Sequence, residues 1–345
     1  MSSLVPNYEV KLLLEPSKVL ESDDRLNNAI RSAFNIQQGT KKMNVIFMDT
    51  EKQHIYNVGW SLRIRKSEND NKFELTYKKR YPVGEGLSAA TAGSIDATLE
   101  TAKQEGFGSS YKAQVEVGYK KQTLSISRDE EIPSTSFQGT DLPSVIYLRR
   151  FLRAKVPDEF KNWSANNWGT KYLDESIVYG PVLAKRSKGT WEGFELSIEV
   201  WPIRKSRDDA SLELIVEASF KTPDFQKAVE GHANLERFLR ERGWLLEEDS
   251  LKTKLIMERY GDSWRSKSEM LDMEWRNVHE VFLEFWWKAL PPSLRPIPWP
   301  CHVVMNVCEH STQHLQARFV LLIGLLKTAD LRRRNTLTLH HTLIS

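Results

Sequence analysis

The run at residues 7–14 places charged side chains at alternate positions. Asn7, Glu9 and Lys11 lie two residues apart, with Tyr8 and Val10 between them. In an extended strand, successive side chains point to opposite faces, so this strand has one charged and one apolar face. The charged face therefore lies against open solvent or against a polar cavity.

The same alternation returns in later segments. Arg63 and Arg65 alternate with Leu62 and Ile64. We expect strands at 45–49, 60–65, 72–78, 112–127, 176–186, 194–201 and 211–220. Their polar faces bring together Glu74, Thr76 and Lys78; Glu116 and Lys120; Glu195, Ser197 and Glu199; and Glu213, Ile215, Glu217 and Ser219.

A cavity with such walls could hold a polyanion. Arginine forks match phosphate oxygens and lysine acts as a point charge, so the candidate phosphate ligands are Lys11, Arg63, Arg65 and Lys78. Acids on the same faces would repel a polyanion unless a divalent cation lay between them; these acids are Glu9, Glu116, Glu199, Glu213 and Glu217. Mg²⁺ or Mn²⁺ takes oxygen ligands from carboxylates and phosphates. The pattern therefore indicates phosphoryl transfer by positioning and electrostatic stabilisation.

Two plainer interpretations of the alternation stay open at this level. An open antiparallel sheet with one solvated face shows the same spacing. Glu9 and Lys11 could also form a surface ion pair, which would contribute little to stability. The matching parity of the other strands favours the cavity.

Strand register decides which basic residues enter that cavity, because a slip by one residue exchanges the two faces of a strand. For this reason the alternation does not decide whether Lys120 enters the cavity, or which of Lys185 and Arg186 does. We expect Lys66, Lys79 and Arg80 to lie at strand ends or outside the cavity, as solvated charges.

Segments with helical spacing lie between the strands. Leu26, Ile30 and Phe34 share one helical face after a cap at Ser22 or Asp23. Further helices are expected at 95–104, 141–160, 224–242 and 250–260. The fold class is therefore α+β, and the simplest architecture is a closed antiparallel barrel with a charged bore, surrounded by helices on its apolar outer side.

Composition narrows the functional class. The 345 residues carry a net charge of only +3, so we expect no nucleic-acid partner. The two cysteines, Cys301 and Cys308, make no disulfide framework. The longest apolar stretch, 319–326, is far shorter than the ~20 residues that span a bilayer. With no recognisable signal peptide at the start, we expect a soluble, cytoplasmic protein with no membrane partner.

The segment 263–345 differs from the rest and is expected to form a separate C-terminal extension after a barrel domain at 1–262. A helix is expected at 264–290, followed by a proline-rich break at 291–300 and then an irregular, poorly ordered stretch. The cysteines and histidines of this stretch do not match a standard zinc-ligand spacing.

Four motifs together resemble the CYTH superfamily, the triphosphate tunnel metalloenzymes. They are the runs 8–11, 47–50, 62–65 and 75–78, and the likeness extends through residues 5 to 260. The resemblance implies an eight-stranded antiparallel tunnel and metal-dependent hydrolysis or cyclisation of a triphosphate. Its members include thiamine triphosphatases and inorganic triphosphatases, so inorganic triphosphate, thiamine triphosphate or a nucleoside triphosphate is the expected substrate.

The resemblance also implies roles for individual residues. Catalytic roles fall to Lys11, Glu9, Arg63 and Arg65. Phosphate binding is expected from Lys11, Arg63, Arg65, Lys78, Lys120, Lys185 and Arg186. Glu9, Glu199 and Glu217 are expected to bind Mg²⁺ or Mn²⁺, with Glu116 and Glu213 as weaker candidates.

Two departures from the family pattern weaken the metal site. The opening motif of the family is Glu-x-Glu-x-Lys, and Asn7 stands at its first acid. The late Glu-x-Glu pair is broken, because Glu217 is flanked at two residues by Ile215 and Ser219. A polyphosphate- or nucleotide-binding module without turnover is therefore an alternative. A third possibility is an interaction protein whose charged sheet face docks a partner. The sequence leaves the oligomeric state open.

Overall fold

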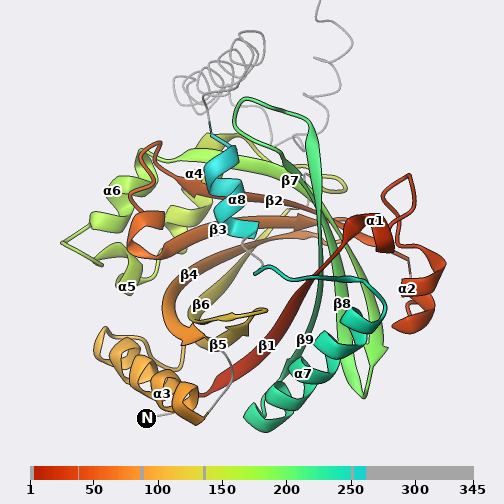
Figure 1. Ribbon diagram of the computed structural model, residues 1–345. Helices are drawn as coiled ribbons and strands as arrows, with labels where there is room; N and C mark the ends of the chain where they lie inside the picture. The colour runs from red at the N-terminus through yellow and green to blue at the C-terminus, as the bar shows by residue number, and fades with distance from the viewer. Residues whose placement is uncertain (1–3, 38, 86–88, 135–136, 250–251, 262–345) are drawn as a thin grey trace, which may run out of the picture. The chain divides into compact units, whose positions relative to one another are not determined.

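The fold described below is that of a computed structural model (Figure 1). It describes residues 4–37, 39–85, 89–134, 137–249 and 252–261. The predictions for the C-terminal extension after residue 262 lie outside these residues. No described helix is both long and apolar enough to cross a membrane.

Ten strands in the described segments form one sheet. Their bounds are β1 (Pro6–Leu14), β2 (Lys41–Asp49), β3 (Trp60–Ser67), β4 (Lys72–Glu85), β5 (Lys112–Val117), β6 (Lys121–Pro133), β7 (Ile177–Trp191), β8 (Phe194–Arg204), β9 (Leu212–Thr222) and β10 (Leu245–Leu246). The order is β10-β1-β5-β6-β4-β3-β2-β7-β8-β9, and β1 also pairs with β9. That last pairing closes nine strands into a barrel, while β10 stays outside it.

The closed, charged-bore barrel predicted from the sequence is confirmed, with a correction to its strand count and direction. Nine strands, rather than eight, make up the ring within the described chain, and β1 runs parallel to β5. The other pairs around the ring are antiparallel. A closed ring with an odd number of strands cannot alternate direction throughout, so one parallel pair is a geometric necessity.

Strand register brings the charged positions to a common level inside the barrel. Glu9 of β1 pairs with Glu116 of β5, and Arg65 of β3 pairs with Glu74 of β4. Glu199 of β8 stands opposite Glu217 of β9. The alternation within each strand therefore becomes a single charged surface that faces inward.

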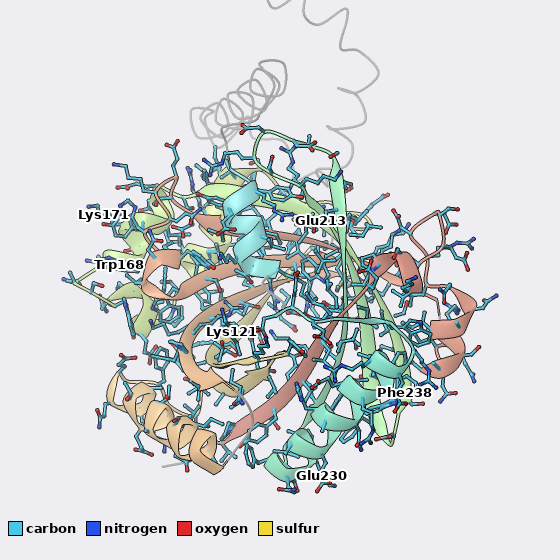
Figure 2. The ribbon with its side chains drawn as sticks, in the orientation of Figure 1. Lys121, Trp168, Lys171, Glu213, Glu230 and Phe238 are labelled. Atoms are coloured by element: carbon cyan, nitrogen blue, oxygen red, sulfur yellow. The ribbon has the colours of Figure 1, made fainter. Side chains whose placement is uncertain are left out.

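Helices cover the apolar outer side of the barrel (Figure 1). They are α1 (Pro16–Val19), α2 (Asn28–Ala33), α3 (Ala89–Gln104), α4 (Val145–Ala154), α5 (Asp158–Lys161), α6 (Trp168–Asp174) and α7 (Phe225–Glu241), with a short 3₁₀ turn η1 (Tyr56–Val58). Val10 and Leu12 of β1 belong to the buried cluster under them. Phe238 of α7 packs against Phe34 and Trp191 in the same layer (Figure 2).

Two predicted elements were too long. The strand expected at 112–127 is a hairpin of β5 and β6, because the chain turns between Val117 and Lys121. The helix expected at 141–160 divides into α4 and α5, separated by a break that ends at Pro157. A residue before proline disfavours the helical region, so a helix rarely continues through it.

A second buried apolar cluster fills one end of the barrel interior. It joins inward-facing side chains of the strands, such as Val45 and Trp201, to Ile256 and Met257 of helix α8 (Lys252–Arg259). The hydroxyl of Tyr260, just after α8, accepts a hydrogen bond of 3.0 Å from the backbone N–H of Arg204. Helix α8 is thereby held against the interior, and its first residue points toward the charged part of the barrel.

We expect Leu12→Ala to lower the free energy of unfolding by about 2 to 5 kcal/mol, because it leaves a cavity in the layer between barrel and helices. Leu12 is 0 % exposed. The matched control is Leu212→Ala, at a strand position 57 % exposed, which should change stability by less than about 0.5 kcal/mol. Urea denaturation measures both values. Similar losses in the two variants would contradict the burial of Leu12 beneath the helices.

Candidate functional site

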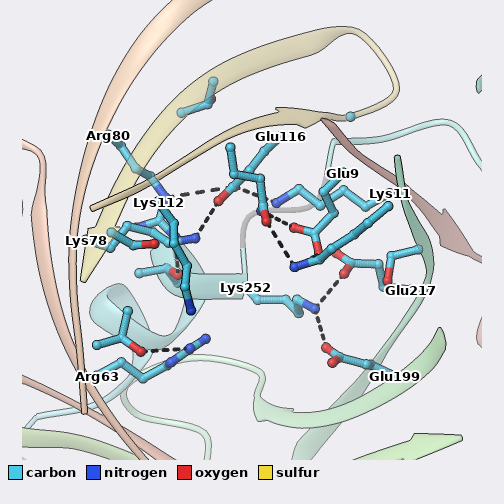
Figure 3. Close-up of a pocket in the computed structure, with 18 of the residues that line it drawn as sticks. Glu9, Lys11, Arg63, Lys78, Arg80, Lys112, Glu116, Glu199, Glu217 and Lys252 are labelled. Carbon is cyan, nitrogen blue, oxygen red and sulfur yellow. Dashed lines mark hydrogen bonds and ion pairs between the residues drawn. The ribbon is translucent and has the colours of Figure 1, made fainter. Parts of the chain in front are cut away.

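A charged cavity of about 680 Å³ lies inside the barrel (Figure 3). Among the residues described, its lining contains eleven cationic and seven anionic side chains. The cations are Lys11, Arg63, Arg65, Lys78, Arg80, Lys112, Lys121, Arg186, Lys221, Lys252 and Lys254; the anions are Glu9, Glu74, Glu116, Asp129, Glu199, Glu217 and Asp249. The surplus of positive charge makes the cavity a site for an anion.

Strands β3 and β4 form the most basic wall. Arg63 donates hydrogen bonds to Thr76 at 3.0 Å and to Glu74 at 3.5 Å, and Arg65 donates to the same Glu74 oxygen at 2.5 Å. Burial, together with the neighbouring charge of Arg65, lowers the pKa of Arg63 to about 10. A lowered pKa for an arginine means that its charge is under-compensated, so an added anion would stabilise the charged form.

Glu116 of β5 is the counter-charge of two buried lysines. Its carboxylate accepts hydrogen bonds from Lys11 at 2.6 Å and from Lys78 at 2.8 Å, and Arg80 lies 4.0 Å away. Burial would raise the pKa of the Glu116 carboxyl, but Lys11 and Lys78 outweigh it and hold that pKa well below its ordinary value.

The two lysines respond differently to this shared acid. Burial alone would lower the pKa of Lys11, yet Glu116, Glu217 and Glu9 raise it overall. Burial and the nearby arginines lower the pKa of Lys78 despite Glu116. Positive charge is therefore least compensated at the wall with Lys78 and Arg63.

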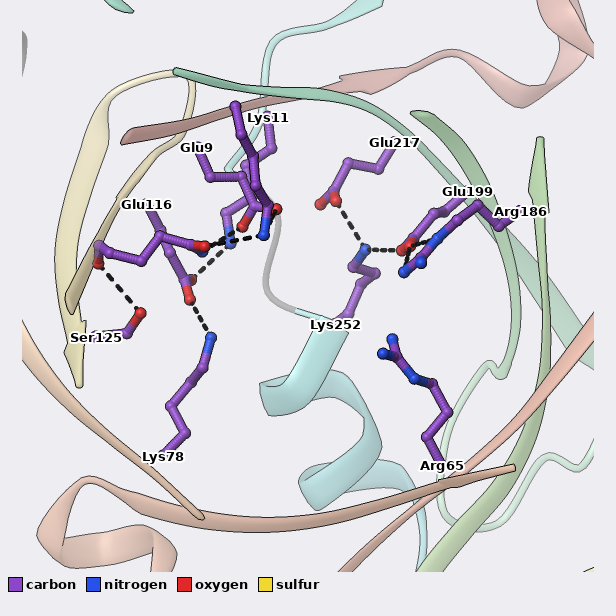
Figure 4. A network of polar contacts seen from close by, with 12 residues as sticks. Glu9, Lys11, Arg65, Lys78, Glu116, Ser125, Arg186, Glu199, Glu217 and Lys252 are labelled. Atoms are coloured by element: carbon purple, nitrogen blue, oxygen red, sulfur yellow. Dashed lines mark hydrogen bonds and ion pairs between the residues drawn. The ribbon is translucent and has the colours of Figure 1, made fainter. Parts of the chain in front are cut away.

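Two carboxylates on the opposite wall converge on one ammonium group (Figure 4). Nζ of Lys252 lies 2.8 Å from Oε2 of Glu199 and 2.8 Å from Oε1 of Glu217. Glu199 also accepts hydrogen bonds from Arg186 at 2.7 Å and from the indole of Trp201 at 2.8 Å. Although burial opposes ionisation, Lys252 and Arg186 lower the pKa of Glu199, and the two acids raise the pKa of Lys252.

Two buried polar atoms of the cavity have no hydrogen-bond partner within the described part of the chain. They are Nε of Arg63, a donor, and Oε2 of Glu217, an acceptor. Buried polar groups are normally paired, and an unpaired one often marks a ligand position. One atom is suited to an anion and the other to a cation or a donor group.

Glu9 and Asn7 lie on β1, between these two walls. Gln114 donates a hydrogen bond of 2.6 Å to Glu9, and Lys221 lies 3.4 Å from its other oxygen. Asn7 also lines the cavity, without adding charge.

Most of the predicted site residues meet in this cavity. Those brought together are Glu9, Lys11, Arg63, Arg65, Lys78, Glu116, Arg186, Glu199 and Glu217. Three others lie outside its lining: Lys120, Lys185 and Glu213. Lys120 lies in the exposed turn between β5 and β6. Lys185 points away from the cavity, because Arg186 points into it and adjacent side chains of a strand face opposite sides. Glu213 lies near the start of β9, beyond the apolar cluster, and pairs with Arg259 at 2.7 Å.

Lys66, Lys79 and Arg80 were expected at strand ends or outside, as solvated charge. Lys66 does lie next to the end of β3, but none of the three side chains is exposed. Arg80 lines the cavity, as its parity with Lys78 on β4 requires. Lys66 is 1 % exposed and its ammonium group donates to the backbone carbonyls of Ser67 and Asp70. Lys79 is also buried, with its ammonium group 4.5 Å from the ring centre of Trp163.

Lys252 is the main residue missed by sequence reasoning. It comes from a helix, and strand alternation gives no information about which helix end reaches into a barrel. Its neighbours Thr253 and Ile256 also line the cavity. A short helix with only three apolar residues among eight is a weak signal by itself.

The donor chemistry of the acidic wall fits a hard divalent cation. Glu199 and Glu217 direct oxygens at one point, and Glu217 keeps a second, unpaired oxygen. Carboxylate oxygens are the ligands that Mg²⁺ and Mn²⁺ prefer. In the described structure, however, no three acidic, histidine or cysteine side chains gather as one metal-binding group, and Lys252 lies where the two acids meet.

The closed barrel argues against an open sheet with one solvated face as the explanation of the alternation. Because β1 pairs with both β5 and β9, the charged faces line an interior and not an open, solvated sheet. A flat partner surface cannot reach such a face. The docking of a protein partner on the charged sheet is therefore disfavoured.

Several solved structures are similar to this chain. HpAC1 from Hippeastrum, described as having a dominant triphosphatase activity, has 18% identity and a TM-score of 0.42, covering 72% of this chain and 93% of its own. A candidate adenylate cyclase from Bacillus halodurans has 12% identity and a TM-score of 0.38, covering 72% and 97%. The PH1819 protein from Pyrococcus horikoshii OT3 has 15% identity and a TM-score of 0.35, covering 77% and 99%.

No family model matches the chain, and no curated protein sequence matches it.

We expect Glu116→Gln to lower the free energy of unfolding by about 3 kcal/mol, because it leaves Lys11 and Lys78 buried without a counter-charge. Urea denaturation at neutral pH measures the change. Glu131→Gln is the control, since its pair with Lys72 is exposed and contributes little. Equal losses in the two variants would show that the buried triad does not carry this stability.

Proposed function

We propose that the cavity binds a triphosphate-containing small molecule and hydrolyses it with the help of a divalent cation. The observation that carries this proposal is the under-compensated basic wall of β3 and β4. Burial lowers the pKa of both Arg63 and Lys78, although acids lie close to each. A bound polyanion would supply the missing negative charge.

The form of the basic wall suits phosphate groups in particular. Arg63 and Arg65 offer planar forks that match phosphate oxygens, and Nε of Arg63 is available without breaking another hydrogen bond. Lys11, Lys78 and Arg80 add further positive charge around the same volume. A cavity of about 680 Å³ is within the usual range for a small-molecule site.

Hydrolysis requires the acidic wall as well. Glu199 and Glu217 would hold the cation, with Glu9 on the neighbouring strand β1. A divalent cation held there supplies polarisation of the phosphoryl group and orientation of the attacking water. The protein's own basic residues hold the phosphates in place and stabilise the negative charge that develops on them.

Binding without turnover is the second candidate function, and two observations favour it. Asn7 occupies the position of the first acid in the CYTH opening motif, so that wall carries one charge less. Lys252 lies between Glu199 and Glu217, where the cation would be held. In that case the cavity keeps the phosphate-binding residues of a triphosphatase but lacks a working metal site.

We expect Arg63→Ala to weaken binding of inorganic triphosphate by about 10- to 100-fold, as loss of charge-assisted hydrogen bonds would do. Isothermal titration calorimetry in metal-free buffer measures the affinity. Arg128→Ala is the matched control, because Arg128 lies on the outer face of β6 and pairs with Glu130. Unchanged affinity in Arg63→Ala would contradict the phosphate-binding role of this wall.

The two candidate functions differ in phosphate release. Triphosphate, thiamine triphosphate and ATP would each be incubated with Mg²⁺ or Mn²⁺ while phosphate is measured. If the protein is a hydrolase, release depends on the added cation and falls at least about 100-fold in Glu217→Gln, which removes a metal ligand. Tight triphosphate binding without cation-dependent release would establish the binding module instead.

A further inference from the structure

Lys252 occupies an unusual position for a lysine. It is the first residue of α8, and its side chain is only 15 % exposed. Its ammonium group lies 2.8 Å from a carboxylate oxygen of Glu199 and 2.8 Å from one of Glu217, and 4.7 Å from the ring centre of Trp201. A single positive charge thus serves both acids of the proposed metal site.

We propose that the Lys252 ammonium group is a built-in cation that competes with a divalent metal ion for Glu199 and Glu217. This inference rests on the proposed function, because it concerns how the cation site of that function is filled. Metal binding then requires Lys252 to leave the acids. In the metal-free protein, Lys252 and Arg186 together balance the charges of Glu199 and Glu217, so that the wall does not repel an incoming polyanion.

Steric and electrostatic reasons make the two cations exclusive. A divalent ion at the meeting point of these oxygens would lie about 2.1 Å from each, in the volume that the ammonium group fills at 2.8 Å. Two cations at such close range also repel each other strongly in a buried site. The acids can therefore hold either Lys252 or the metal ion at this point.

The remaining contacts of Glu199 reinforce this exclusivity. Its Oε1 accepts from Arg186 and its Oε2 accepts from both Trp201 and Lys252. Displacing Lys252 frees one acceptor position on Oε2, while the contacts with Trp201 and Arg186 stay intact. Glu217 is less constrained, because its Oε2 has no hydrogen-bond partner among the described residues.

Release of Lys252 does not require α8 to leave the barrel. The far end of the helix is anchored by Arg259, which donates to the backbone carbonyl of Arg204 at 2.7 Å, and by the apolar contacts of Ile256 and Met257. Lys252 is at the other end, on a flexible four-carbon side chain. A rotation of this side chain into the cavity would be sufficient, and there its charge could approach a bound phosphate.

A purely structural role for Lys252 is the competing explanation. In that case the ammonium group only neutralises two buried acids, and its removal would destabilise the protein whether or not metal is added. Competition predicts something more: removal of the ammonium group should open the site to metal, and metal should restore the lost stability. Metal binding measured without any substrate separates the two.

The experiment is a Mn²⁺ titration of the full chain in the absence of phosphate compounds, followed by calorimetry and by the electron paramagnetic resonance signal of free Mn²⁺. Lys252→Met should bind Mn²⁺ at least about tenfold more tightly than the unmodified protein, because a repelling charge beside the site is gone. Lys252→Arg keeps the charge and should stay weak. Lys254→Met is the control, since Lys254 also lines the cavity but faces Glu258 at 3.6 Å.

Thermal unfolding gives a second readout. Lys252→Met should unfold at a lower temperature than the unmodified protein without metal, and Mn²⁺ should recover most of the difference. Glu217→Gln combined with Lys252→Met should remove the gain in Mn²⁺ affinity. If Lys252→Met does not fold, Lys252→Gln replaces it, because its amide offers two N–H donors without carrying a charge.

Equal Mn²⁺ affinity in Lys252→Met and the unmodified protein, with no recovery of stability, would overturn the competition. Triphosphate binding to the basic wall is measured in metal-free buffer and does not depend on this result. A failure of the inference therefore leaves the phosphate-binding proposal standing. A failure of triphosphate binding would be visible separately, in the Arg63→Ala comparison.

Discussion

Compensation of buried charge is the constraint on which the barrel interior depends. An ionised side chain taken out of water is costly unless an opposite charge and hydrogen bonds replace its hydration. Glu116 meets this need for Lys11 and only in part for Lys78, and Lys252 supplies a counter-charge to Glu199 and Glu217. The closed ring can have a charged lining because these groups neutralise one another across different strands.

The sequence predicted the faces of strands better than their ends. Alternation correctly put Glu9 and Arg63 inside, because the side-chain period of a strand is fixed at two. It failed for Lys120, since a turn interrupts the period between β5 and β6. Glu213 has the right parity, but it lies beyond the apolar cluster, and parity does not say how far along a strand the cavity extends. Arg80 was misassigned even though it shares a face with Lys78.

Features that arise from packing between distant segments could not be predicted from local patterns. Ring closure through β1, with one parallel pair, depends on the number of strands and not on the pattern of any one strand. The position of Lys252 depends on how α8 packs, which is decided by Ile256 and Met257 against strands far away in the sequence. Residues 250–260 do have helical spacing, yet nothing local indicates that the start of this helix enters the cavity.

The charge distribution also indicates the order in which ligands would bind. The acids of the cavity are largely neutralised by partners of the chain itself, whereas Arg63 and Lys78 on the facing wall remain under-compensated. A divalent cation alone would add positive charge to a cavity that already has a surplus, and it would also have to displace Lys252. A polyanion alone reduces that surplus and meets no such barrier. Under the proposed function, the cation would therefore enter most favourably with the polyanion or after it, when the phosphates would offset its charge and could give Lys252 a second partner.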